Sequence, residues 1–152
     1  DNVVLLYENL DGAGSFGSQQ IIENSFSGDL NSVYASDIDL DGDMDVLASF
    51  SSDQLINWYE NLDGQGNFGS AQMVASNVGA VSDLQATDID LDGDMDIVAI
   101  SASFSNNVYW IENLNGLGSF GQVNVISSNS NVARGVYSCD LDGDGFLSIN
   151  LP

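Results

Sequence analysis

The chain has 152 residues, of which 23 are acidic and only one, Arg134, is basic, and it contains no His. The formal net charge of −22 argues against nucleic acid or an anionic membrane surface as a partner, because both would repel the chain. Hydrophobic residues make up 43% of the sequence, which excludes an acidic disordered tail, and no stretch predicts membrane insertion.

The first element along the chain is a strand-like segment that enters a glycine-rich turn. Residues 6–17 read LYENLDGAGSFG, residues 58–69 read WYENLDGQGNFG, and residues 110–121 read WIENLNGLGSFG. The block therefore recurs every 52 residues, starting at positions 6, 58 and 110. A fixed period in this range predicts a repeat architecture such as a propeller or a solenoid.

Between the copies of this block lies a second repeated element, an acidic loop. Residues 37–45 and 88–96 share the sequence DIDLDGDMD, and residues 140–148 form a looser copy, DLDGDGFLS. Thirteen of the 23 acidic residues lie in these three loops. Alternating carboxylates around a glycine turn supply the hard oxygen ligands that Ca²⁺ prefers, and such dense negative charge needs a counter-ion. The sequence therefore predicts that the chain binds calcium.

The segments around the loops have the character of β-strands. Residues 46–50 and 97–100 are short apolar runs, typical of strands buried on both faces. Residues 107–111 are β-branched and aromatic, and residues 123–126 alternate as the returning strand. One period then contains four strands, with the acidic loop after the first and the glycine hairpin after the third. This pattern predicts an all-β fold of four-stranded blades like those of a β-propeller.

We expect a single repeat array over residues 1–152 with about three blade equivalents. Full blades are predicted at residues 27–77 and 78–129. Residues 1–26 are expected to carry strands three and four of a blade, and residues 130–152 strands one and two, so half a blade lies at each end. Propellers typically close with four to eight blades, so something is expected to complete this array. A ring of several chains, a head-to-tail filament, or a longer protein of which this chain is a fragment would each do so.

Together, the acidic loop and the aromatic glycine block resemble the FG-GAP/VCBS repeat family over essentially the whole chain. Such repeats build the calcium-bearing blades of integrin α-subunit propellers and of many secreted bacterial surface proteins. The resemblance thus implies an extracellular or cell-surface location and two full calcium sites with a third, degenerate one. The implied ligands are the side chains of Asp37, Asp39, Asp41 and Asp45 with the Asp43 carbonyl; those of Asp88, Asp90, Asp92 and Asp96 with the Asp94 carbonyl; and Asp140, Asp142, Asp144, the Phe146 carbonyl and Ser148. Ser148 replaces the final carboxylate, so the third site is expected to be weaker or empty.

The sequence predicts no catalytic site, because it lacks His, Lys and a G-x-S-x-G element. The function we expect is a non-enzymatic, calcium-stabilised structural or adhesion module that self-assembles through its complementary half-blades. One alternative is a calcium-dependent propeller lectin that binds carbohydrate between blades. In that case the aromatic side chains of the repeated strand would stack on sugars instead of packing between blades; these are Trp58, Tyr59, Tyr109 and Trp110. A second alternative is a fragment of a larger secreted propeller protein.

Overall fold

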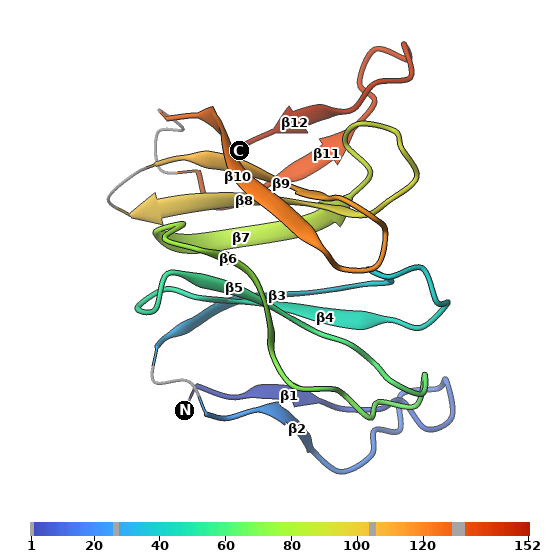
Figure 1. The fold of residues 1–152 in the computed structure, drawn as a ribbon. Coiled ribbons are helices and arrows are strands. Elements are labelled where there is room, and N and C mark those ends of the chain that lie inside the picture. The colour runs from blue at the N-terminus through green and yellow to red at the C-terminus, as the bar shows by residue number, and fades with distance from the viewer. Residues whose placement is uncertain (1, 26–27, 104–105, 129–132) are drawn as a thin grey trace.

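The computed structural model describes residues 2–25, 28–103, 106–128 and 133–152. In these ranges the chain forms twelve β-strands and no helix, and the strands make four antiparallel sheets. The sheets are stacked in chain order and do not close into a ring (Figure 1). No helix long and apolar enough to cross a membrane occurs in the described part of the chain.

Every strand pairs with its neighbour in sequence, so each sheet is a simple meander. The N-terminal half-blade contains β1 (Val4–Leu6) and β2 (Gln20–Glu23). The first blade contains β3 (Leu30–Ser36), β4 (Asp45–Phe50), β5 (Leu55–Tyr59) and β6 (Gln72–Ser76). The second blade contains β7 (Ala80–Thr87), β8 (Asp96–Ser103), β9 (Val108–Asn113) and β10 (Phe120–Ser127), and the C-terminal half-blade contains β11 (Tyr137–Cys139) and β12 (Ser148–Asn150).

The predicted fold class is confirmed: two four-stranded sheets lie between two two-stranded ones. The acidic loops follow the first strand of a sheet, and the glycine hairpins follow the third strand, as expected. The predicted boundaries after residues 26 and 129 lie outside the described residues. The boundary after residue 77 falls between β6 and β7, and the division into blades stays a prediction.

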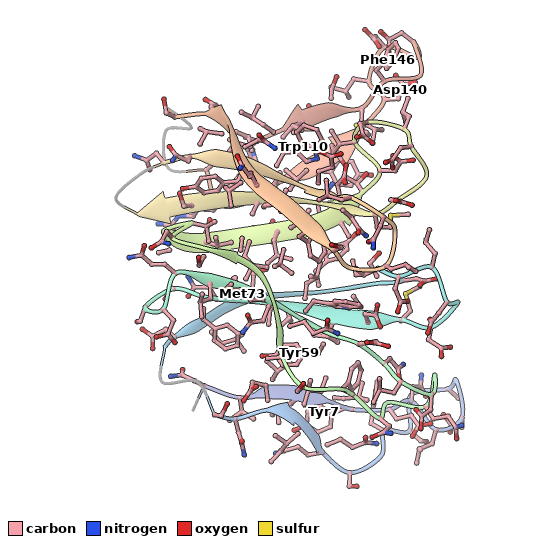
Figure 2. The ribbon with its side chains drawn as sticks, in the orientation of Figure 1. Tyr7, Tyr59, Met73, Trp110, Asp140 and Phe146 are labelled. Atoms are coloured by element: carbon pink, nitrogen blue, oxygen red, sulfur yellow. The ribbon has the colours of Figure 1, made fainter. Side chains whose placement is uncertain are left out.

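The second strand of a blade is buried on both faces, because alternate side chains point to opposite sides of the sheet. On β4, Leu47 packs into the core toward the second blade, whereas Ala48 and Phe50 pack toward the N-terminal half-blade. Val4 and Tyr59 join the latter cluster, and Figure 2 shows Tyr59 in the space between the two sheets. Stacking on both faces explains the uninterrupted apolar sequence of this strand.

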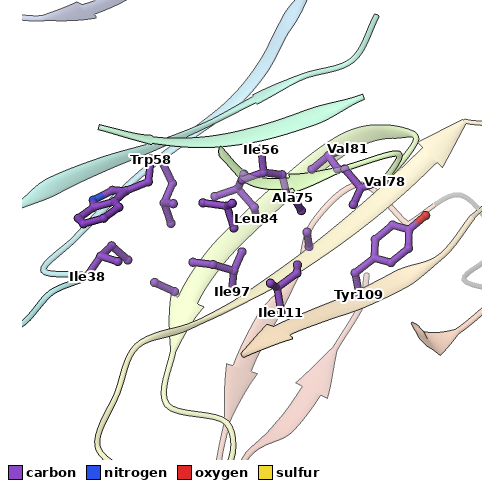
Figure 3. Close-up of a cluster of buried hydrophobic side chains, with 14 residues drawn as sticks. Ile38, Ile56, Trp58, Ala75, Val78, Val81, Leu84, Ile97, Tyr109 and Ile111 are labelled. Atoms are coloured by element: carbon purple, nitrogen blue, oxygen red, sulfur yellow. The ribbon is translucent and has the colours of Figure 1, made fainter. Parts of the chain in front are cut away.

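The largest core lies between the first and second blades (Figure 3). Ile56 and Trp58 of the first blade meet Leu84, Ile97 and Ile111 of the second, and all five are buried. Burying one such aliphatic side chain contributes about 1.5–3 kcal/mol, so this shared core holds neighbouring blades together.

In each glycine hairpin one side-chain oxygen accepts two hydrogen bonds from the backbone. An Asp or Asn Oδ1 atom accepts hydrogen bonds from the backbone N–H groups two and four residues further on, at distances of 2.8–3.3 Å. The acceptors are Asp11, Asp63 and Asn115. Both residue types offer this oxygen, which explains why Asn replaces Asp in the third copy.

Candidate functional site

Each acidic loop turns twice through left-handed backbone. In the first loop Leu40 has φ 60° and Gly42 has φ 99°, and the second loop repeats these angles within a few degrees. In the third loop both positions are Gly, Gly143 and Gly145, with φ 79° and 90°. Left-handed φ angles are uncommon for a residue such as Leu. The repeated geometry shows that the same tight wrap is built three times.

The loop folds its own carboxylates inward by hydrogen bonds from its backbone. In the first loop Gly42 N–H donates to Asp37 Oδ2 at 3.1 Å, and Asp43 N–H donates to Asp41 Oδ1 at 2.9 Å. Asp41 N–H donates to Asp39 Oδ1 at 3.3 Å. The second loop repeats all three bonds at the same distances. The peptide groups therefore orient the carboxylates around one centre.

The last carboxylate of each full loop is buried and ties the loop to the point where the third strand of its blade leads into the glycine hairpin. Asp45 Oδ2 accepts from Ile38 N–H at 3.1 Å, and Asp45 Oδ1 accepts from Asn61 N–H at 2.8 Å. Asp96 makes the equivalent bond with Asn113 N–H at 2.9 Å. Sequence reasoning missed the two Asn residues, although an Asn at the same place in all three aromatic blocks was the available signal.

Trp110 also belongs to this arrangement, because its indole N–H donates to Asp96 Oδ2 at 3.0 Å. The packing interpretation of the other aromatic residues is confirmed, since Trp58, Tyr59 and Tyr109 are buried between sheets. Burial removes these three rings as a platform for an incoming sugar.

One buried oxygen in each full loop has no hydrogen-bond partner. It is Oδ1 of Asp37 in the first loop and Oδ1 of Asp88 in the second. Burying a carboxylate oxygen without compensation is costly, so the same unpartnered atom at the same place in both loops fits a bound cation.

The pKa directions agree with a site that lacks positive charge. Burial raises the pKa of both Asp45 and Asp96 above the usual value for Asp. Burial, together with the negative charge of Asp45, also raises the pKa of Asp39. The protein therefore disfavours the ionised form of these groups in the absence of a cation.

Three carboxylates converge in each loop, with one oxygen from each lying within 4.8 Å of the others. The groups are Asp37, Asp39 and Asp45; Asp88, Asp90 and Asp92; and Asp140, Asp142 and Asp144. Each group could hold a metal ion. Two other predicted side-chain ligands, Asp41 and Asp96, are not in these groups.

The side chains of Asp43 and Asp94 point toward the glycine hairpin of the same blade. A Cβ atom added to Gly64 would overlap the Asp43 carboxylate, and one added to Gly116 would overlap that of Asp94. The main-chain carbonyls of these two Asp residues thus remain their predicted ligand atoms.

The third loop has the same backbone bonding but a different charge environment. Gly145 N–H donates to Asp140 Oδ2 at 3.0 Å, as Gly42 does in the first loop, and Gly143 N–H donates to Asp140 Oδ1 at 2.7 Å. These peptide groups lower the pKa of Asp140 below its usual value. Both of its oxygens are thus satisfied within the loop. Figure 2 shows Asp140 and Phe146 at the outer end of the stack.

A sequence profile described as an FG-GAP-like repeat matches residues 37–99 and again residues 88–149. The chain belongs to the FG-GAP-like repeat family. Each FG-GAP-like match runs from one acidic loop to the end of the next, so the family's repeat unit contains the loops described above. FG-GAP repeats often bind calcium and are typical of extracellular proteins. Comparison with curated proteins gave no match.

Proposed function

We propose that this chain is a non-enzymatic, calcium-stabilised repeat module of an extracellular structural or adhesion protein. The observation that carries the proposal is the unpartnered buried oxygen of Asp37, repeated in Asp88. Converging carboxylates with a glycine turn suit Ca²⁺, which takes six to eight oxygen ligands. The unfolded chain has no such preformed site, so the binding free energy adds to the stability of the fold.

The residues that would hold the ions are those assigned from the sequence. They are Asp37, Asp39, Asp41, Asp45 and the Asp43 carbonyl in the first loop, and Asp88, Asp90, Asp92, Asp96 and the Asp94 carbonyl in the second. In the third loop they are Asp140, Asp142, Asp144 and the Phe146 carbonyl, with Ser148 in the last position. Bound calcium supplies positive charge that balances carboxylates crowded into nine residues.

Calorimetric titration of the metal-stripped protein with Ca²⁺ tests this part of the proposal. We expect two tighter sites and one weaker site. Asp37→Asn and Asp88→Asn should each remove one tight site, because each replaces an anionic oxygen by a neutral amide of the same size. Glu8→Gln changes an exposed carboxylate outside the loops and serves as the control. Unchanged calcium heats in the double variant would overturn the proposal.

The second part of the proposal is self-assembly through the two half-blades. Its support is that both end sheets have only two strands, whereas both inner sheets have four. Isolated two-stranded sheets are marginal in water, so each half-blade gains from further strands. Sedimentation of the 152-residue chain with calcium is the test. We expect closed rings or filaments, and a folded monomer at high micromolar concentration would refute self-assembly.

A calcium-dependent lectin is the second candidate, favoured by one cavity. A cavity of about 240 Å³ lies between the end of β1 in the N-terminal half-blade and the glycine hairpin of the first blade. Its lining includes the polar side chains Glu8, Asn61 and Gln65 beside the Phe68 ring. Glycan-array binding that disappears with chelator, and again in a Phe68→Ala variant, would favour the lectin over the structural module.

A further inference from the structure

We propose that β12 of one chain pairs with β1 of a second copy in the register that β4 keeps with β5. The strands β11 and β12 of one copy and β1 and β2 of the next then form one composite four-stranded blade. This inference rests on the proposed self-assembly and specifies its interface. It follows from contacts that the chain already makes twice between its own blades.

A repeated hydrogen bond links each blade to the next. Asn31 Nδ2 donates to the Val81 carbonyl at 3.0 Å, and Ser82 Oγ donates to the Ala133 carbonyl at 3.4 Å. Arg134 holds the same position in the C-terminal half-blade, and its side chain is exposed. In a continued stack its guanidinium would reach the carbonyl at the start of β3 in the second copy.

The two ends of the stack of sheets expose the surfaces that meet inside it, at the interface between the first and second blades. Leu84 on β7 is covered by the first blade and is 1% exposed, whereas Val33, at the same position on β3, is 54% exposed. Ile38 is covered by the second blade and is 0% exposed, whereas Leu141, at the same position in the third loop, is 65% exposed. Each end therefore displays one half of a contact that is buried inside the stack.

The N-terminal face also contains an apolar cavity where two strands of a full blade would lie. It measures about 280 Å³ and opens between the half-blade and β3. It is lined by Val4, Leu5, Leu6, Ile22, Val33, Tyr34, Ala35 and Val46. Strand β12 of a second copy would lie over this space as β4 lies beside β7, while its Ile149 stays packed on the second blade of its own chain.

A paired replacement indicates that the two half-blades fit each other. In the second blade the Trp110 indole donates to Asp96, and the first blade has the same two residue types, although its Trp58 indole N–H has no hydrogen-bond partner. Leu6 replaces Trp in the N-terminal half-blade, and Ser148 replaces Asp in the C-terminal one. The N-terminal half-blade therefore lacks the indole donor, and the C-terminal half-blade lacks the buried carboxylate. Joining the two half-blades leaves neither group without its partner.

The hairpins supply a further match. A Cβ atom on Gly118 would overlap the Trp58 ring, so the hairpin of the second blade lies directly on the first. Trp110 occupies the position of Trp58 but is only half-buried. The hairpin that would cover it is that of the second copy, where Gly14 holds the position of Gly118. No atom lies within 4 Å of the Cβ position of Gly14 in the single chain, so the site is open.

The internal sheets define the expected register. In the first blade Val46 pairs with Tyr59 and Ala48 with Asn57, and in the second Ile97 pairs with Ile111 and Ala99 with Tyr109. Transferred by repeat position, both blades give the same pairing across the two copies, namely Ile149 with Tyr7 and Leu151 with Leu5.

Disulfide trapping tests this register in the full chain with Cys139→Ser. The matched variant carries Leu151→Cys and Leu5→Cys, and the control carries Leu151→Cys and Leu6→Cys, a shift of one residue that turns the second thiol to the opposite face. Directly opposed residues in an antiparallel pair lie within disulfide reach, so the matched variant should form inter-chain disulfides under mild oxidation. We expect at least tenfold more cross-linked dimer or ladder than in the control.

The outcomes separate the register from self-assembly. Equal cross-linking in both variants, or none in a sample that sediments as an assembly, would overturn the composite blade and leave self-assembly intact. A monomeric wild-type chain would refute both, and the open faces would then belong to further repeats of a longer chain or to another partner.

A second pair of variants does not depend on cysteine chemistry. Val33→Asp places a charge on the face that β11 and β12 of the second copy would cover. This variant should therefore sediment as a monomer. Leu62→Asp is the matched control, because Leu62 is exposed on the hairpin of a complete blade. Assembly that survives in Val33→Asp would overturn the proposed interface.

Discussion

Asp45 and Asp96 each combine a structural contact with a predicted metal-binding role. The carboxylate lies at the end of the acidic loop and accepts a hydrogen bond from a backbone N–H group where the third strand of its blade leads into the glycine hairpin. Burial raises the pKa of this carboxyl group, which means that its ionised form is unfavourable in the folded protein. A bound cation would offset that cost. Substitution separates the two roles in part, because an amide keeps one of the two acceptor oxygens but carries no charge.

We predict that Asp96→Asn abolishes the second calcium site and costs less metal-free stability than Asp96→Ala, because the amide keeps one of the two acceptor oxygens. Asp96→Ala should abolish the same site and also lower the free energy of unfolding by about 1–3 kcal/mol, because Asn113 N–H and the Trp110 indole lose their acceptor. Calcium calorimetry and urea unfolding in chelator measure the two effects. Equal metal-free stabilities of the two variants would contradict the structural role.

We predict that Ser148→Asp strengthens the third calcium site. The hydrogen bond from Gly145 N–H to Asp140 matches the bond from Gly42 N–H to Asp37 in the first loop. Ser148 therefore occupies the position that Asp45 has in the first loop. Restoring the carboxylate adds an anionic ligand where Ser offers a neutral hydroxyl. The heat of the weakest site should shift to lower calcium concentration. Three equivalent sites in the unmodified chain would show that this alignment is wrong.

At the scale of the elements, the glycine hairpins position one blade on the next. We predict that Gly118→Ala destabilises the chain by roughly 1–3 kcal/mol more than Gly14→Ala does, because only the first new methyl group overlaps the Trp58 ring. Both positions have positive φ, 75° and 98°, so the backbone penalty is shared and cancels in the comparison. Urea unfolding at concentrations where the chain is monomeric gives the difference, and equal effects would contradict the contact.

Much of the fold follows from patterns that are local in sequence. The 52-residue recurrence, the apolar run in β4 and the glycine turns predicted the strand order of each blade. The first of the two strands expected in residues 1–26 is short in the structure, where β1 covers only Val4–Leu6 in a sheet of two strands.

The site was predictable only in part, for a physical reason. The acidic residues lie close together in sequence, so their convergence follows from the loop itself. The anchoring of Asp45 by Asn61, and of Asp96 by Trp110, depends on which residues the sheet places opposite each other. That register is set by packing between strands far apart in sequence, and the aromatic block alone did not reveal it.

At the scale of the whole molecule, the charge opposes contact between copies. Two calcium ions would change the formal net charge from −22 to −18, and a third would bring it to −16. The remaining repulsion is long-range and therefore screened by salt, while apolar contacts such as those of Val33 are not. We predict that raising NaCl from 20 to 300 mM at saturating calcium increases the sedimenting mass. A loss of assembly with salt would contradict an apolar interface between like-charged chains.

Chelation tests the largest consequence of the proposed sites for the whole chain. Each site stabilises the fold by about 2.7 kcal/mol when free calcium is 100 times its dissociation constant. In a chain of this size 1 kcal/mol corresponds to roughly 2–4 °C, so two sites predict that excess EDTA lowers the melting temperature by about 10–20 °C. EDTA already saturated with calcium is the control for effects of the chelator itself, and Asp37→Asn combined with Asp88→Asn should remove most of the shift. A melting curve that EDTA leaves unchanged would show that the clustered carboxylates are tolerated without a metal ion.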